Sequence, residues 1–369
     1  MSIELEVQLV AVVVAMACSL AGVFLVLRRL ALMSDAISHT VLLGIVLVFF
    51  ITRDITSPFL IFGAALMGVA TVGLVELLRR TRLVREDASI GLVFPALFSI
   101  AVILISRYAG AVHLDTDAVL LGEIAFTPFT RFAPFGVDLG PRTLWVMSGI
   151  LLLNVLFITA LYKELKLSTF DPGLAAALGF APTLLHYAFM TLVSITVVGA
   201  FDAVGSILVV ALMIAPPATA TLLSHSLRTV VVLSLLIAAA SALAGFWGAW
   251  LLDASIAGCM ATAAGFFFML ALLLAPDRGI VAVARRKQRQ RWEFARAMLA
   301  IHLLHHEGTP DSALESNEAH LGEHLRWDAA FARRVVREAA EEELIEREPD
   351  GRLLLTAHGR DVAQRVMAT

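Results

Sequence analysis

The stretch "LRRLALMSDAISHTVLLGIVLVFF", residues 27–50, decides the fold and raises the question of function. An arginine pair opens this stretch, and a long apolar run closes it. Asp35 and His39 lie in the part that is apolar enough to enter a bilayer, and their i, i+4 spacing puts them on one helix face. A carboxylate inside a membrane costs about 2.5–3.5 kcal/mol. We therefore expect Asp35 and His39 to face the interior of a helix bundle or a water-filled pathway.

The composition of the whole chain is that of a membrane protein with a water-soluble extension. Hydrophobic residues make up 59% of the 369 positions and charged residues only 16%, whereas soluble domains carry roughly 25% charged residues. About half of the charged residues of each sign lie in residues 285–369. We therefore predict a transmembrane domain over residues 1–284 and a cytoplasmic domain over residues 285–369.

Apolar runs long enough to span a bilayer predict an all-α polytopic membrane protein with about nine transmembrane helices. Each span needs about 20 largely apolar residues. The predicted spans are residues 7–27, 33–52, 58–78, 88–107, 143–162, 182–201, 204–224, 229–251 and 256–275.

The short loops predict the orientation of these spans. Lys and Arg are more frequent in the loops that would be inside if the N-terminus is outside. The C-terminal domain is then cytoplasmic, with the basic run "RRKQRQR" (285–291) at the anionic membrane lipid. The acidic start "MSIELEVQLV" favours a first span over a removed signal peptide.

The chemistry of the intramembrane pair leaves three hypotheses open. A carboxylate oxygen and a neutral imidazole nitrogen suit Mn²⁺, Zn²⁺ or Fe²⁺. A structural Asp–His hydrogen bond between helices and a proton relay are the alternatives. Asp202, between two spans, and Glu123, in an apolar piece (118–129) too short to span, are further candidate metal ligands. Asn154 is predicted to be a packing residue with its polar group satisfied.

Two segments are expected to interrupt the regular spans. In the inside loop "KELKLSTFDPGLAAALGFAPT" (163–183), Asp171 and Pro172 start a short helix that Gly179 ends, which favours a docking surface. The pair Pro216-Pro217 is predicted to break or kink its helix. The sequence contains no GxxxxGK[ST] pattern, so ATP binding through such a loop is not expected.

Three of these stretches together resemble one family. "RRLALMSDAISHTVLLGI" (28–45) resembles the signature of the permease subunits of bacterial ABC importers for manganese, zinc and iron, with Ser34 where the family usually has glycine. "FDAVGSILVVALMIAPPATA" (201–220) is similar to a second family stretch. "DPGLAAALGF" (171–180) resembles the cytoplasmic segment that couples these permeases to their ATPases.

The resemblance implies the membrane subunit of an ATP-driven importer of divalent metal, manganese first and zinc or iron next, in the bacterial cytoplasmic membrane. ATP hydrolysis would take place on partner ATPases, a second permease subunit would complete a homo- or heterodimer, and an extracytoplasmic metal-binding protein would deliver the metal. Asp35 and His39 would hold the transported ion at the subunit interface, and no cofactor would be permanently bound. The segment implied in ATPase coupling comprises Thr169, Phe170, Asp171, Pro172, Gly173, Leu174, Ala177, Leu178 and Gly179.

Two alternatives from other classes of protein stay open. The chain could be a secondary metal carrier that needs no ATPase, in which case the chain alone would accumulate metal. It could also be a membrane-tethered metal sensor, in which case replacing Asp35 and His39 would leave uptake intact.

The C-terminal domain reads as three helices, a hairpin and a last helix capped by Thr356, and it resembles the winged helix of iron-dependent-type repressors. The acidic run "EEELIERE" (341–348) leaves it without net positive charge, so binding to nucleic acid is not expected. We therefore predict a regulatory or docking role for the C-terminal domain. Histidine-rich tracts bind metal, and the candidate regulatory ligands are His302, His305, His306, His320 and His324.

Overall fold

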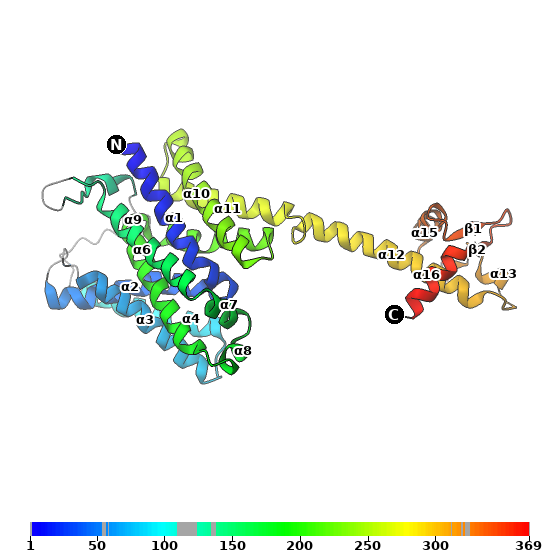
Figure 1. Cartoon of the computed structure of the whole chain (residues 1–369), viewed down its shortest axis with the longest axis horizontal. Helices are drawn as coiled ribbons and strands as arrows, with labels where there is room; N and C mark the ends of the chain where they lie inside the picture. The colour runs from blue at the N-terminus through cyan, green and yellow to red at the C-terminus, as the bar shows by residue number, and fades with distance from the viewer. Residues whose placement is uncertain are drawn as a thin grey trace. The chain divides into compact units, whose positions relative to one another are not determined.

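The structure of the chain is a computed structural model (Figure 1). It describes residues 2–53, 57, 59–108, 124–133, 138–310, 312–318, 320–321 and 325–368. The chain forms two compact units, Met1–Gly279 and Ile280–Thr369. We call them the membrane unit and the C-terminal unit.

The membrane unit is a bundle of long apolar helices. Among the described residues, nine stretches are long and apolar enough to cross a bilayer, which confirms the expected number of spans. One long helix supplies two of them, Pro182–Phe201 and Ala203–Leu223. The long helices are α1 (Ile3–Leu27), α2 (Ala31–Thr52), α3 (Phe59–Arg80), α4 (Glu86–Tyr108), α6 (Arg142–Ala160), α9 (Pro182–Leu223), α10 (Leu227–Leu252) and α11 (Ile256–Leu274).

Helix α1 forms the centre of the bundle and packs against α6, α9 and α10. Its small side chains allow close contact, and polar groups inside the bundle are paired. Ser19 and Ser234 share a hydrogen bond of 2.5 Å between their hydroxyl oxygens. The buried amide of Asn154 donates to the carbonyl oxygen of Ala17 and to Thr196 Oγ1. Asn154 is therefore the satisfied packing residue that was predicted.

The break in α9 lies at Gly205 and not at the proline pair. Gly205 has φ 72° and ψ 168°, a conformation that is cheap only for glycine, whereas the helix continues through Pro216 and Pro217 to Leu223. The helix is therefore not broken at the prolines, whereas the predicted kink there stays a prediction. Pro217 removes the donor to the carbonyl of Met213, and Gly22 of α1 packs directly on that carbonyl, since a Cβ there would overlap its oxygen.

Helix α9 consists of two limbs, one before and one after Gly205. The first limb begins, and the second limb ends, on the same side of the membrane unit. The guanidinium of Arg28, just after α1, lies 5.2 Å from the ring centre of Phe189 in the first limb. Gly22, in the same half of α1, contacts Met213 in the second limb. Arg278 Nη1 donates to the carbonyl oxygen of Thr221 at 2.8 Å. The chain therefore leaves the membrane unit on the side of Arg28, opposite the start of α1.

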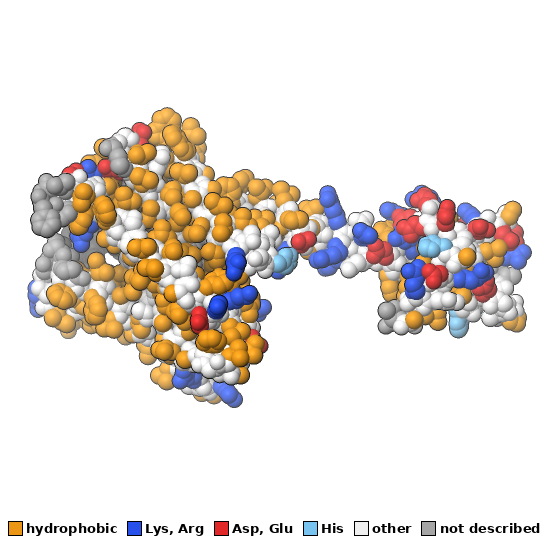
Figure 2. Space-filling model, viewed as in Figure 1, with side chains coloured by type: hydrophobic (Ala, Val, Ile, Leu, Met, Phe, Trp, Pro, Cys, Tyr) orange, Lys and Arg blue, Asp and Glu red, His pale blue; other side chains and the backbone are white. Residues whose placement is uncertain are grey.

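The C-terminal unit has its own hydrophobic core, built on α12 (Ile280–His306) and α15 (Ala329–Glu341). Strands β1 (Ile345–Arg347) and β2 (Leu353–Leu355) form an antiparallel pair, and α16 (Ala357–Met367) follows, capped by Thr356 as expected. The hydroxyl of Thr356 accepts from the amide of Gly359. Figure 2 shows hydrophobic side chains over most of the visible face of the membrane unit and charges of both signs on the C-terminal unit.

The segment between α12 and α15 differs from the expected helix over residues 313–325. Among residues 312–318, α13 (Ser312–Glu315) is helical, and the backbone turns after it. Asn317 then forms an isolated antiparallel bridge with Arg352, and Ser316 accepts from the amide of Leu353 at 3.0 Å. At residues 316 and 317, hydrogen bonds to the hairpin satisfy backbone groups that a continuous helix would have paired within itself.

Candidate metal site

Asp35 and His39 lie in the first turns of α2, about 6 Å and about 12 Å along the helix from Ala31. His39 Nε2 is 3.5 Å from Asp35 Oδ1. The side chains are 45% and 27% exposed for Asp35 and His39, although they belong to a span of otherwise apolar character. The pair therefore reaches the surface of this chain within the membrane.

The accessible face of α2 is narrow and contains the pair. Leu32, Asp35 and His39 are at least partly exposed, whereas Ser34 and Ser38 are buried toward the bundle. The hydroxyl of Ser34 donates to the carbonyl of Ala31, and that of Ser38 donates to the carbonyl of Ser34. Both serines are satisfied within α2, so neither competes for the carboxylate.

Two aromatic rings of α4 flank the His39 imidazole. The ring centre of Phe94 lies 5.2 Å from that of His39, and the ring of Phe98 meets it edge-on at 5.7 Å. These rings restrict the orientation of the imidazole and exclude water from that side. Neither ring was among the predicted site residues, and their signal in the sequence is a pair of phenylalanines at i, i+4 in "LVFPALF".

The geometry of the pair suits two ligands of one ion better than a hydrogen bond. Two ligands bound at about 2.0–2.2 Å lie about 3–4 Å apart, whereas an N–H···O hydrogen bond is about 2.7–3.2 Å. Both residues belong to α2, so their contact does not join two helices. Two ligands leave the coordination of a transition metal incomplete, and the exposed face leaves room for ligands from outside this chain.

The other predicted ligands of the membrane unit are not placed by the structure. Glu123 lies outside the described residues. The backbone of Asp202 is in α9 near the break at Gly205, and its side chain is outside the described part.

The predicted coupling segment forms α7 (Tyr162–Phe170) and α8 (Pro172–Ala177). The carboxylate of Asp171 accepts from the amide of Leu174 at 2.9 Å, and Pro172 occupies the first helical position. Gly179, at φ 86°, ends α8, where the amide of Phe180 donates back to the carbonyl of Ala175. Phe170, Leu174, Leu178 and Phe180 are exposed large apolar side chains of this segment.

Arg28 joins this segment to the α1–α2 junction, a contact that the sequence analysis did not find. Its Nε donates to Thr169 Oγ1 and its Nη2 to Ser168 Oγ, both at 3.0 Å. Burial lowers the pKa of Arg28 to about 10, so the guanidinium stays charged at neutral pH. The charge holds α7 beside the two residues that precede α2.

In the C-terminal unit, the structure brings together only part of the predicted histidine group. One ligand atom each of His302, His306 and Glu315 lie within 4.8 Å of one another. His305 is exposed on the neighbouring face of α12, and His320 is not in this group. His324 lies outside the described residues. Glu315 was not among the predicted ligands, because its approach to α12 depends on how the chain turns back between α12 and α13.

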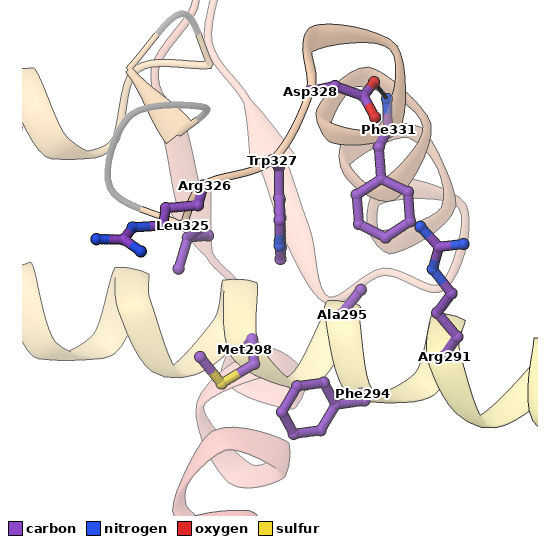
Figure 3. A pocket seen from close by; sticks show the side chains of 9 residues that line it. All are labelled: Arg291, Phe294, Ala295, Met298, Leu325, Arg326, Trp327, Asp328 and Phe331. Carbon is purple, nitrogen blue, oxygen red and sulfur yellow. Dashed lines mark hydrogen bonds between the residues drawn. The ribbon is translucent and has the colours of Figure 1, made fainter.

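A separate cavity of about 340 Å³ lies between α12 and the start of α15 (Figure 3). Trp327 and Phe331 meet edge-on there with ring centres 5.5 Å apart, and the guanidinium of Arg291 lies 4.7 Å from the Phe331 ring centre. Asp328 is the one carboxylate in its lining, and it is occupied in capping α15 through the amides of Ala330 and Phe331. The cavity is therefore not a metal site.

Known proteins are similar to this chain in sequence. The sequence model of the ABC 3 transport family matches residues 2–275 of this chain. The chain is 49% identical over 360 residues to "Zinc transport system membrane protein TroD" of Treponema pallidum, covering 98% of each protein, so the likeness includes the C-terminal unit. It is 46% identical over 281 residues to "Manganese transport system membrane protein MntD" of Bacillus subtilis, covering 76% of this chain and 95% of the relative.

A solved structure also matches the membrane unit. "PsaBC from Streptococcus pneumoniae in complex with Fab" superposes with a TM-score of 0.63 at 27% identity. The match covers 75% of this chain and 94% of the other.

Proposed function

Since the chain belongs to the ABC 3 transport family, we propose that a divalent transition metal ion crosses the membrane between Asp35 and His39 and the facing groups of a second permease subunit. The chain is the permease subunit of an ABC metal importer, and a separate partner hydrolyses ATP. The Asp–His pathway, the second subunit and the identity of the metal are the parts that we propose.

The exposure of Asp35 is the observation that carries the proposal. Its side chain is 45% exposed at the surface of a single chain, inside a span. A carboxylate that faces lipid costs up to about 2.5–3.5 kcal/mol, the value for the centre of a span, so a protein surface or a water-filled path is expected to cover it. A second permease subunit supplies both and adds the ligands that the pair lacks.

The choice of metal rests on the donor set and on the relatives. Carboxylate and imidazole suit both Mn²⁺ and Zn²⁺. The relative that matches over the whole chain is named for zinc, and MntD is named for manganese. We therefore propose manganese or zinc as the transported ion.

The proposed orientation places the start of α1 outside the cell and the C-terminal unit in the cytoplasm. Arg28 contacts α7, so α7 and α8 lie on the side from which the chain leaves the membrane unit. That side is richer in Lys and Arg, in agreement with a cytoplasmic location in a bacterial inner membrane. The exposed apolar side chains of α8 would dock the ATPase, and an extracytoplasmic protein would deliver metal at the opposite side.

The C-terminal unit is proposed to be a winged-helix-like module with a regulatory or docking role. The hairpin β1–β2 and the bridge from Asn317 to Arg352 support this assignment. Its interleaved charges favour a protein or metal over nucleic acid as the partner.

Uptake of radioactive manganese and zinc by metal-starved cells tests the pathway. Asp35→Asn, which keeps the shape and removes the charge, should abolish at least nine-tenths of the uptake, on the order of the tenfold loss expected for one ligand. Glu76→Gln is the matched control, because Glu76 pairs with Arg79 and Arg80 at the end of α3. Normal uptake by Asp35→Asn would refute the pathway.

A further inference from the structure

We propose that His302, His306 and Glu315 form a second metal site, in the C-terminal unit and separate from the transport pathway. The site would bind a divalent transition metal ion, Zn²⁺ more tightly than Mn²⁺. Only its role as a sensor of imported metal rests on the proposed function, because that role requires a cytoplasmic C-terminal unit.

The three side chains converge from two elements. His302 and His306 lie one turn apart on α12, with ring centres 4.8 Å apart. Glu315 is the last residue of α13, and its Oε2 lies 3.7 Å from His302 Nε2. One ligand atom from each residue falls within 4.8 Å of the others. Ligands that share an ion at about 2.0–2.2 Å are about 3–4 Å apart. The site would close by side-chain rotations in which His302 Nε2 gives up its 3.1 Å hydrogen bond to the carbonyl oxygen of Glu315.

The positions of the ligands are fixed by packing. The side chains of His302 and Glu315 are only 10% and 9% exposed, unlike surface histidines that sample many orientations. Leu299 and Leu303 bury the adjacent face of α12 in the core of the unit. The bridge from Asn317 to Arg352 holds the chain that follows Glu315. Binding would therefore require little ordering of the protein.

The ligand set points to an exchangeable transition metal ion. Two imidazoles and one carboxylate leave at least one coordination position for water, whereas closed structural zinc sites use four protein ligands. His306 is partly exposed, which leaves an entry path. The affinity of a given nitrogen and oxygen ligand set for divalent first-row metals is lower for Mn²⁺ than for Zn²⁺, so this site would hold Zn²⁺ more tightly. It is suited to sensing the concentration of an imported metal.

His305 provides a matched control on the same helix. It is exposed, its ring meets that of His306 edge-on at 5.3 Å, and it is not in the group of three. A generic affinity of histidine-rich helices for metal would involve His305 as much as His306. A specific site formed by His302, His306 and Glu315 would not involve His305.

The test uses the purified full-length chain in lipid nanodiscs, with Asp35→Asn and His39→Gln to remove the pathway pair. Equilibrium dialysis against Zn²⁺ should find one ion per chain, and Co²⁺ should give the visible absorption bands of a site with nitrogen and oxygen ligands. His306→Ala and Glu315→Gln should each weaken Zn²⁺ binding by at least about tenfold, whereas His305→Ala should bind as the parent does.

A rescue variant separates ligation from packing. His306→Cys should restore Zn²⁺ binding and add a thiolate charge-transfer band to the Co²⁺ spectrum, which a side chain that only packs would not produce. Unchanged binding in His306→Ala, equal loss in His305→Ala, or a cysteine variant without the new band would each overturn the proposal. The pathway is tested separately by uptake, so the two proposals fail independently.

Discussion

Removing the Arg28 guanidinium should loosen α7 while the spans stay folded. Arg28→Met keeps the apolar stem and removes the charged hydrogen bonds to Ser168 and Thr169. Each such bond contributes about 1.5–3 kcal/mol. The two hydroxyls also donate to the carbonyl of Leu165, so they keep a partner after the change. The lower end of the range applies, and the free energy of opening α7 should fall by about 3 kcal/mol.

Hydrogen exchange measures this opening directly. A loss of about 3 kcal/mol corresponds to a roughly hundredfold faster exchange, and it should be confined to the amides of residues 162–170, with α10 and α11 unchanged. Arg29→Met is the control, because Arg29 is the exposed neighbour in the same junction. Unchanged protection of α7 in Arg28→Met, or equal loss in Arg29→Met, would refute the role of Arg28 as the anchor.

Three further changes test other contacts. Gly22→Ala should lower stability by at least about 2 kcal/mol in thermal unfolding, because its Cβ would overlap a backbone carbonyl of α9, whereas Gly91→Ala, which meets open space, should not. Phe94→Ala frees the imidazole of the pathway pair and should raise the KM for metal uptake several-fold at unchanged protein level. Arg360 holds the pKa of Glu307 below its usual range, so Glu307→Ala should lower the melting temperature slightly at neutral pH, and the difference should vanish as acid protonates the carboxyl.

The spans and the short helix α8 could be predicted because their causes are local. A helix that spans a bilayer needs about 20 apolar residues, and each span can be recognised from its own sequence alone. The same holds for α8, where Asp171 caps, Pro172 starts and Gly179 ends the helix through contacts within a few residues. The i, i+4 spacing of Asp35 and His39 likewise fixed their shared face before any tertiary contact was considered.

The errors arose where a distant partner decides the local structure. Proline usually breaks a helix, yet α9 continues past Pro217, where Gly22 of another helix packs on the carbonyl that has lost its donor, and the non-helical residue is Gly205 instead. Within the second helix expected in the C-terminal unit, Asn317 instead pairs with Arg352 of the hairpin. Such contacts join residues far apart in the chain and leave no periodic signal.

The candidate site shows the same division. The contact between Asp35 and His39 could be predicted from their spacing, whereas the two rings around His39 and the link from Arg28 to α7 could not. Glu315 escaped prediction for the same reason, since only the folded turn brings it to α12.

The most direct test of the transport site is the structure of the assembled importer soaked with Mn²⁺, with anomalous scattering recorded at the manganese edge. We expect an anomalous peak within bonding distance of both Asp35 and His39, at the contact between the two permease subunits. A peak elsewhere, or a structure in which both side chains face lipid, would contradict it.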